Sequence, residues 1–151
     1  MKAVVQRVSK AAVEVDGETI GSIDAGLLLL VGVSRNDSAV DAQAISEKVA
    51  GLRIFSDAAG QMNLSVKDVS GSVLVVSQFT LYGETVRGRR PSFSAAAPGV
   101  MAEPLVESLA ALLEHEGIPV ARGKFCAKMT VVLVNDAPVT IIIETEEGRL
   151  V

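Results

Sequence analysis

A proline interrupts two strand-like runs near the carboxyl end of the chain, in residues 135–140 (NDAPVT). The runs on either side, 131–134 and 139–143, consist almost entirely of Val, Ile, Leu and Thr, residues that favour strands. Pro138 has no N–H to donate to a sheet ladder, so it must occupy a turn, a bulge or an exposed edge. The sequence therefore predicts β-structure on both sides of a rigid backbone irregularity.

The length and composition predict one globular domain. The chain has 151 residues, 49% of them hydrophobic and 21% charged, which suffices for a core but not for a second independent domain. The longest apolar run, around residues 27–31, is too short to span a bilayer, and the first residues do not resemble a signal peptide. We therefore expect a cytoplasmic protein with no membrane partner. A single cysteine fits a reducing compartment, and the apolar neighbours of Cys126 predict a buried, inert thiol.

Alternation of apolar residues and turn signals predict a sheet with two inserted helices. Asp16-Gly17 is a typical hairpin turn, and Pro104 fits a helix only in its first turn. Because the strands cluster into hairpins, we expect a single α+β domain over residues 1–145 with a largely antiparallel, curled or barrel-like sheet. Residues 146–151 are predicted to form a flexible tail. The predicted strands are 2–8, 12–15, 27–33, 54–55, 71–79, 124–134 and 139–145, and the predicted helices are 40–52 and 102–116.

The charge of the chain restricts nucleic-acid binding to local patches. The formal net charge is 14 − 18 = −4, which argues against broad, non-specific binding of nucleic acid. Arg87, Arg89 and Arg90 nevertheless lie within four residues of a loop that contains Gly and Pro. Their forked donors are suited to phosphates, although a solvated basic loop is the alternative.

Most side chains that usually carry catalysis are missing. His115 is the only histidine, and at the end of the second predicted helix it suits the helix dipole better than the role of a general base. The sequence contains no plausible Ser-His-Asp triad, Cys-His pair or zinc cluster, and no phosphate-loop or dinucleotide fingerprint. We expect no metal and no cofactor.

The remaining candidate is the end of a buried strand, residues 77–81 (SQFTL), which opens a long loop over 80–97. Backbone N–H groups leave the ladder at such a point and are free to bind a ligand. Donors of this kind stabilise an oxyanion, and losing one costs about 3 kcal/mol of barrier. Alternatively, Ser77 and Thr80 only cap the strand end. Thr80 as a nucleophile would need a base, which is not visible nearby.

The chain resembles the D-aminoacyl-tRNA deacylases in motifs distributed from end to end. The motifs are 1–8 (MKAVVQRV), 52–55 (LRIF), 62–66 (MNLSV), 77–81 (SQFTL), 88–93 (GRRPSF) and 135–140 (NDAPVT). The resemblance implies a homodimer that hydrolyses the ester between a D-amino acid, or glycine, and the terminal adenosine of tRNA. It also implies that the active site lies at the dimer interface, and that the 2′-hydroxyl of the tRNA helps to activate water.

The resemblance also implies roles for individual residues. The proline motif would reach into the partner's site as a chirality filter, in which fixed backbone atoms clash with an L side chain and tolerate hydrogen. Arg7 would support this motif; its alternative is a solvent-facing strand residue. The catalytic residues would be Ser77, Gln78, Phe79 and Thr80, the aminoacyl pocket would include Phe125, Ala127 and Met129, and we expect Arg87, Arg89 and Arg90 to bind tRNA.

The chain departs from the family pattern at Ala137, where the family has Gly before a cis proline. A positive φ at this position would strain Ala by about 1 kcal/mol or more, whereas a residue that precedes proline usually prefers extended conformations. A cis X–Pro bond is a minority state, about 5–6% of such bonds, so it must be held, and Arg7 is the candidate. We expect a cis peptide here, and continued removal of D-amino acids with altered discrimination against glycine.

Two other functions compete with this interpretation. A non-catalytic tRNA-binding or editing-like accessory module would share the fold, and only Ala137 favours it. A small-ligand-binding barrel is the third candidate, but nothing predicts its ligand. The intact 77–81 motif, Arg7 and the basic loop favour the enzyme. Release of free D-amino acid would identify the enzyme, and binding without turnover would identify the module.

Overall fold

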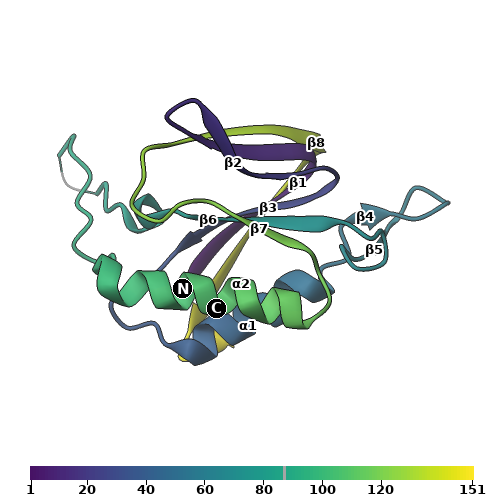
Figure 1. Ribbon diagram of the computed structural model, residues 1–151. Helices are drawn as coiled ribbons and strands as arrows, with labels where there is room; N and C mark the ends of the chain where they lie inside the picture. The colour runs from purple at the N-terminus through teal and green to yellow at the C-terminus, as the bar shows by residue number, and fades with distance from the viewer. Residues whose placement is uncertain (87) are drawn as a thin grey trace.

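Two helices lie side by side against one face of a curled sheet (Figure 1). This is a computed structural model that describes residues 1–86 and 88–151. The strands are β1 (Lys2–Val15), β2 (Glu18–Ile23), β3 (Gly26–Gly32), β4 (Phe55–Ser56), β5 (Met62–Leu64), β6 (Ser72–Ser77), β7 (Val120–Arg122), β8 (Met129–Glu146) and β9 (Arg149–Leu150). The helices are α1 (Ala39–Gly51), the 3₁₀ helix η1 (Phe79–Tyr82) and α2 (Gly99–His115).

The main sheet mixes antiparallel and parallel pairing. Its order is β7-β6-β3-β1-β8-β9, with β2 also paired to β1, and β4 pairs with β5 separately. Pairs that involve β1, β8 or β9 are antiparallel, as predicted, whereas β3, β6 and β7 run parallel to one another. The parallel pairs arise because α1 and α2 each lie in a crossover between two of these strands. The fold is therefore α+β with a curled, open sheet.

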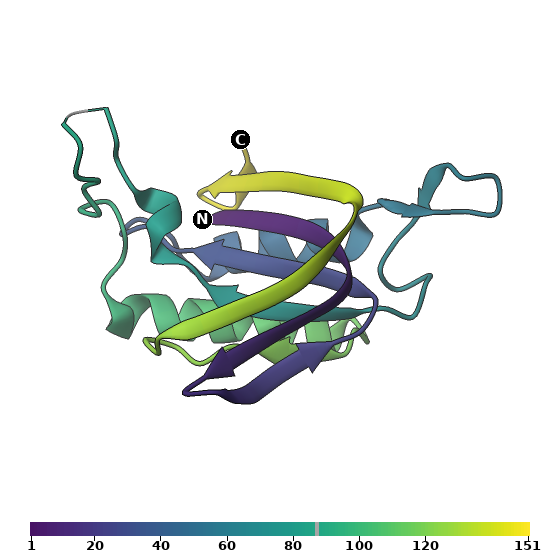
Figure 2. The ribbon, with the colours of Figure 1, turned by 90° about the horizontal axis from the view of Figure 1, so that it is seen from above.

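The curl comes from the two longest strands, β1 and β8, which bend together across the molecule (Figure 2). The first half of β1 pairs with β3 and its second half pairs with β2, while β8 follows it along the other side. The bend folds the sheet over itself. Strands β3 and β6 are consequently enclosed between the helices and the curl.

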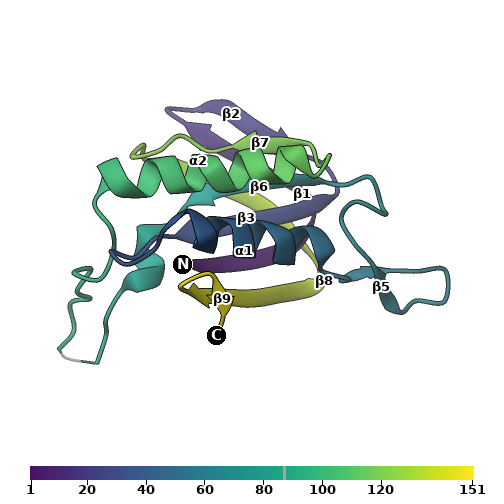
Figure 3. The ribbon, with the colours of Figure 1, turned by 90° about the horizontal axis from the view of Figure 1, so that it is seen from below.

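Alternate residues of β3 therefore enter two different cores. Leu27 and Leu29 pack toward the helices with Ile45 and Leu109, and α1 and α2 cover that face of the sheet (Figure 3). Leu28 points to the opposite face and joins a smaller cluster within the curl. This arrangement explains why the continuous apolar run at 27–33 is buried on both faces.

The second helix begins earlier than its sequence suggests. It starts at Gly99 rather than near residue 102, so Pro104 is its sixth residue and lies beyond the first turn. The prediction for Pro104 was therefore wrong. Proline here deprives the carbonyl of Val100 of its helical donor, but Val100 is 87% exposed, so water can take the place of that donor. Gly117, at φ +82°, ends the helix as predicted.

The predicted flexible tail at 146–151 is instead paired with the domain. Strand β9 pairs with the end of β8, and the Gly148 N–H donates to the Asp41 carboxylate at 2.9 Å. That carboxylate also accepts the N–H of Ser38 at the start of α1. The end of the chain is thus fixed to the start of the first helix.

Candidate active site

The proline motif forms a bulge in the middle of one continuous strand, β8, rather than a gap between two strands. Gln6 of β1 lies opposite Thr140, and Val8 lies opposite Asn135. Four residues of β8, 136–139, therefore face the single residue Arg7. Of the turn, bulge and edge alternatives, the structure shows the bulge.

The peptide bond between Ala137 and Pro138 is not cis, and the residues described contain no cis peptide. The prediction of a cis peptide was therefore wrong. Ala137 has φ +58°, so it adopts the left-handed conformation that we considered the less favoured one for a pre-proline residue. The left-handed residue turns the chain within the bulge, at a cost of about 1 kcal/mol for a side chain with a Cβ. Ala137 and Pro138 are both exposed.

Arg7 lies beneath the bulge and is only 5% exposed, so it is not a solvent-facing strand residue. Its Nη1 donates to the Ile54 carbonyl at 2.5 Å, and its Nη2 donates to the Asp136 carbonyl at 3.2 Å. Its Nε lies 3.2 Å from the Asp136 carboxylate, which is an ion pair without an aligned hydrogen bond. Arg7 thus ties the bulge to the segment that precedes β4.

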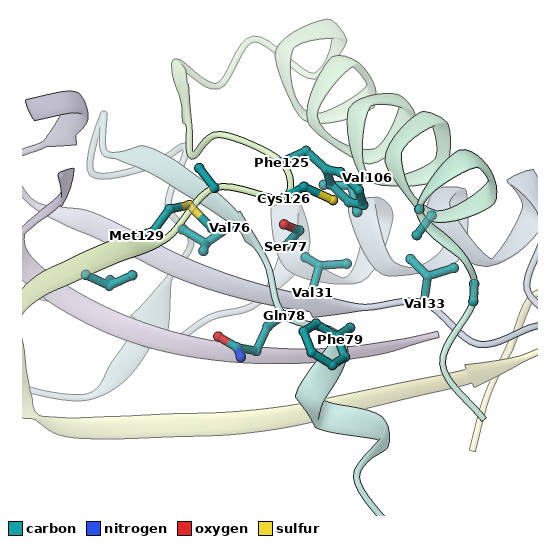
Figure 4. Close-up of a pocket in the computed structure, with 15 residues that line it drawn as sticks. Val31, Val33, Val76, Ser77, Gln78, Phe79, Val106, Phe125, Cys126 and Met129 are labelled. Carbon is teal, nitrogen blue, oxygen red and sulfur yellow. The ribbon is translucent and has the colours of Figure 1, made fainter. Parts of the chain in front are cut away.

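A cavity of about 460 Å³ opens at the carboxyl ends of the parallel strands β3 and β6. The ends of parallel strands release backbone groups and side chains toward a common edge, which is where ligands of such sheets usually bind. The lining residues, shown in Figure 4, are Val31, Val33, Val76, Ser77, Gln78, Phe79, Ala97, Gly99, Ala102, Val106, Phe125, Cys126, Ala127, Met129 and Val131.

The cavity brings together two groups of predicted site residues. Ser77, Gln78 and Phe79 arrive from the end of β6, and they meet Phe125, Ala127 and Met129 from the segment that leads into β8. Figure 4 shows Ser77 on the wall near Phe125 and Cys126, with Gln78 and Phe79 on the side of η1. Thr80 does not line the cavity. It lies on η1, where its hydroxyl accepts a hydrogen bond from the Gln78 side-chain amide.

Backbone donors leave the sheet at this strand end, as predicted. Gln78 still donates its N–H to the Val31 carbonyl, at 2.7 Å. Phe79 and Thr80 follow as the first residues of η1, where an N–H has no carbonyl partner within the helix. Both residues are exposed. These two N–H groups are therefore candidate donors for a ligand beside the cavity, which Phe79 lines and Thr80 does not.

The other end of η1 is anchored to the body of the protein. The Tyr82 hydroxyl lies 3.5 Å from the Asp37 carboxylate, which also accepts the amino group of Met1 at 2.7 Å. Burial, together with the negative charge of Asp37, raises the pKa of Tyr82 well above its usual range. The phenol is therefore neutral at physiological pH and acts here as a structural contact.

Cys126 is exposed and lines the cavity, so the prediction of a buried thiol was wrong. Its residue has φ +58° in the turn that leads into β8. The apolar neighbours Phe125 and Ala127, which suggested a core position, line the cavity instead. An apolar sequence does not distinguish the wall of a cavity from the interior of a core.

The start of α2 supplies lining residues that sequence reasoning missed. Gly99, Ala102 and Val106 contribute one wall. Their spacing of three and four residues places them on one helix face, and this small-residue stripe was the available signal. The predicted helix began at residue 102, which hid the first of the three.

The basic loop leaves the body of the protein next to η1 (Figure 2). Arg87 lies outside the described residues, and Arg89 and Arg90 are exposed. Phe93, at the far end of the loop, packs edge to face on Phe79 with ring centroids 5.1 Å apart. The loop is thus joined to the 77–80 segment, on the cavity side of the molecule.

The bulge and the cavity of one chain do not meet. Neither Ala137 nor Pro138 lines the cavity, whose last lining residue along β8 is Val131, six residues before Ala137 or about 20 Å in an extended strand. Figure 2 shows the bend of β8 on the side of β4 and β5, opposite the basic loop. Within the part of the chain that the structure describes, no cluster of His, Cys, Asp and Glu side chains is arranged to hold a metal. The same residues contain no helix long and apolar enough to cross a membrane.

Comparisons with known proteins agree with this architecture. Proteins named D-aminoacyl-tRNA deacylase from Chloroflexus aurantiacus and Geobacter sulfurreducens are 55% and 56% identical to the chain, over 99% and 97% of it and 94% and 96% of their own lengths. A solved structure titled c-Myc DNA Unwinding Element Binding Protein is 40% identical, with a TM-score of 0.91 over 97% of this chain and 99% of that one. A probable eukaryotic D-amino acid tRNA deacylase, 13% identical, has a TM-score of 0.80 over 93% and 97% of the two chains and shows the fold alone.

The family model described as D-Tyr-tRNA(Tyr) deacylase matches residues 4–144. This match covers most of β1 and β8, the other strands of the main sheet except β9, both α-helices and the 77–80 segment. The cavity and the bulge both fall within it. The chain therefore belongs to the D-Tyr-tRNA(Tyr) deacylase family.

Proposed function

We propose that the protein hydrolyses the ester that joins a D-amino acid, or glycine, to the terminal adenosine of tRNA. The observation that carries the proposal is the cavity, in which the end of β6 meets the 125–129 segment in a chain of this family. We place the activity in the single domain, residues 1–145 together with the end of the chain that pairs with it, and in the cytoplasm, where tRNA is aminoacylated.

The proposed chemistry relies on the backbone and on the substrate. Water, activated with the help of the terminal 2′-hydroxyl of the tRNA, attacks the ester carbon, and the bond to the ribose oxygen breaks to give free amino acid and tRNA. The N–H groups of Phe79 and Thr80 receive the developing oxyanion, and each such donor is worth about 3 kcal/mol of barrier. The Thr80 hydroxyl already accepts a hydrogen bond from the Gln78 amide, and we propose that it orients the attacking water.

A homodimer would bring the bulge of one chain to the cavity of the other. Support comes from the separation of bulge and cavity within one chain, and from exposed apolar side chains on the outer face of β8. Ile142 is 67% exposed, Val132 47% and Val134 45%, and an apolar surface of this kind favours a partner. In the dimer, Ala137 and Pro138 would exclude an L side chain from the partner's cavity.

The activity is tested by incubating the protein with D-tyrosyl-, L-tyrosyl- and glycyl-tRNA. We expect release of free D-tyrosine and glycine, and no release of L-tyrosine. Binding of D-tyrosyl-tRNA without turnover would instead support the accessory module. Hydrolysis of L-tyrosyl-tRNA that disappears in Ala137→Gly would show that Ala137 has opened the filter.

Mixed dimers test whether the bulge acts on the partner. One chain carries Ala127→Trp, which blocks the cavity, and the other carries Arg7→Leu, which loosens the bulge. If the bulge acts on the partner, the only open cavity faces an intact bulge, and the mixed dimer rejects L-tyrosyl-tRNA. If the bulge serves its own chain, the same dimer hydrolyses L-tyrosyl-tRNA.

Phosphate binding by the basic loop is tested by the salt dependence of KM. We expect Arg89→Ala and Arg90→Ala to raise the KM for tRNA and to reduce its dependence on salt. The slope of log KM against log salt concentration should fall by about one unit for each phosphate that the loop no longer binds. An unchanged salt dependence would favour a solvated loop.

A further inference from the structure

The side-chain amide of Asn135 spans the bulge from one end to the other. Its Oδ1 accepts the N–H of Val139 at 3.2 Å, and its Nδ2 donates to the Thr140 hydroxyl at 3.1 Å. The same hydroxyl accepts a bond from the Gln6 side chain of β1 at 3.3 Å. Asn135 thus joins the residue that enters the bulge to the two residues that leave it.

These bonds replace part of the missing sheet ladder. Four bulge residues face one residue of β1, so their backbone groups cannot all find ladder partners. Val139 is the residue that returns to the sheet, and it is only 9% exposed. An unbonded N–H at a buried position is costly, so the Asn135 carbonyl oxygen favours the conformation in which Val139 is buried.

Arg7 and Asn135 act on the bulge in different ways. Arg7 binds the Asp136 carbonyl from below and ties it to Ile54, which fixes where the bulge sits on the domain. Among the described residues, the Asn135 amide bonds to Val139 and Thr140 at the other end of the bulge, which fixes the shape of the bulge. Ala137 and Pro138 lie between these points and are exposed.

We infer that Asn135 is a positioning residue for chirality discrimination: its amide keeps Ala137 and Pro138 projecting as a rigid obstacle to L side chains. The inference rests on the proposed function. An obstacle excludes only while it cannot move aside. Loosening the bulge should therefore admit L substrates while leaving the chemistry at the partner's cavity unchanged.

Substitutions at residue 135 separate the amide chemistry from its bulk. Asn135→Leu has a similar size and loses both bonds, whereas Asn135→Asp keeps the acceptor for Val139 and can accept the Thr140 hydroxyl proton. Gln43→Leu is the matched control, because it removes an exposed amide bond to Glu47 on α1, far from the bulge in sequence and on another element. Each variant is assayed for kcat/KM with D- and L-tyrosyl-tRNA, with thermal unfolding as a check of folding.

We expect Asn135→Leu to raise kcat/KM for L-tyrosyl-tRNA about tenfold, with less than a twofold change for the D substrate. Asn135→Asp and Gln43→Leu should match the unmodified protein. An unchanged L-to-D ratio in Asn135→Leu, or an equal fall for both substrates, would overturn the inference. If Asn135→Leu does not fold, Thr140→Val removes one of the two Asn135 bonds, together with the bond from Gln6, and should raise the ratio about threefold. An unchanged ratio in Thr140→Val would also overturn the inference.

Hydrogen exchange separates a failure of this inference from a failure of the proposed function. The Val139 N–H should exchange about tenfold faster in Asn135→Leu than in the unmodified protein, and at the unmodified rate in Asn135→Asp. This result does not depend on turnover. If the Val139 N–H exchanges faster in Asn135→Leu but the unmodified protein does not hydrolyse D-tyrosyl-tRNA, then Asn135 positions the bulge and the proposed deacylase function is wrong. If exchange is unchanged in Asn135→Leu, then Asn135 does not position the bulge.

Discussion

The cavity end and the bulge end of the molecule are held by different kinds of interaction. The cavity is walled by strand ends and a helix that also form the core, so its shape follows from packing. The bulge is an exposed turn around a left-handed alanine, held by the side chains of Arg7 and Asn135. Packing involves many interactions of similar strength, whereas a bulge with few polar bonds changes when one of them is removed. A substitution in the cavity should therefore lower turnover without changing selectivity, and a substitution at the bulge should change selectivity without lowering turnover of the D substrate.

The largest expected effect is at the cavity end. Ala127→Trp places an indole in the cavity and should lower kcat/KM for D-tyrosyl-tRNA by about 100-fold, because a small displacement of the ester from its catalytic donors is enough for that loss. The ratio of L to D hydrolysis should stay unchanged. Ala127→Ser is the control and should keep most of the activity. A changed ratio would show that the two ends are not independent.

At the bulge end, the largest effect should come from Arg7→Leu. The substitution leaves the carbonyls of Ile54 and Asp136 without a charged donor and should lower the free energy of unfolding by about 3 kcal/mol, measured with urea. Hydrolysis of L-tyrosyl-tRNA should rise relative to the D substrate. Arg7→Lys keeps the charge but cannot reach both carbonyls, so we expect an intermediate loss. Equal stability of all three proteins would mean that the bulge is held elsewhere.

The strands and the loop at the cavity end were largely predictable, because each follows from a local sequence pattern. The apolar run at 27–33 and the strand that ends at Ser77 each indicate a buried strand, and the composition of 80–97 indicates a loop. Their parallel pairing did not follow from the sequence, because it depends on crossovers through α1 and α2. The exposure of Cys126 was missed because apolar neighbours are shared by cores and cavity walls.

The bulge was predictable as an irregularity but not in its conformation. A missing N–H at Pro138 excludes a regular ladder, and nothing in the local sequence decides how the chain compensates. The left-handed Ala137 contradicts the usual preference of a residue before proline. Its strain is offset by a tertiary bond from Arg7 of β1 and by the bonds of Asn135 across the bulge within β8. The tertiary bond from Arg7 is invisible to local propensity.

The Asp41 carboxylate forms polar contacts that lie outside both the cavity and the bulge. Burial disfavours the charged form of Asp41, but backbone hydrogen bonds from Gly148 and Ser38 outweigh it, so its pKa is lowered from 3.8. A lowered pKa adds stability above about pH 3.8 that is lost as the pH falls through the lower value of the folded state. Asp41→Asn should cost about 1 kcal/mol at pH 7 and should flatten the acid side of the stability curve.

The internal control for Asp41→Asn is its selectivity, measured as the ratio of L- to D-tyrosyl-tRNA hydrolysis. Because Asp41 binds the turn after β8 rather than the bulge, the ratio of L to D hydrolysis should not change. A changed ratio would mean that polar contacts anywhere along β8 tune the filter, and that general stability rather than local support controls selectivity.

The smallest expected effect concerns the strain at Ala137. Glycine adopts φ +58° without the penalty that a Cβ carries, but it also gains freedom in the unfolded chain, which offsets part of the benefit. We therefore expect Ala137→Gly to raise the free energy of unfolding by about 0.5 kcal/mol. Ala58→Gly is the matched control, since Ala58 is also exposed and has no positive φ, and it should lower stability slightly. If both substitutions lower the free energy of unfolding, the left-handed bulge is not the dominant conformation in solution. Backbone strain at Ala137 would then not distinguish the bulge from the packed cavity.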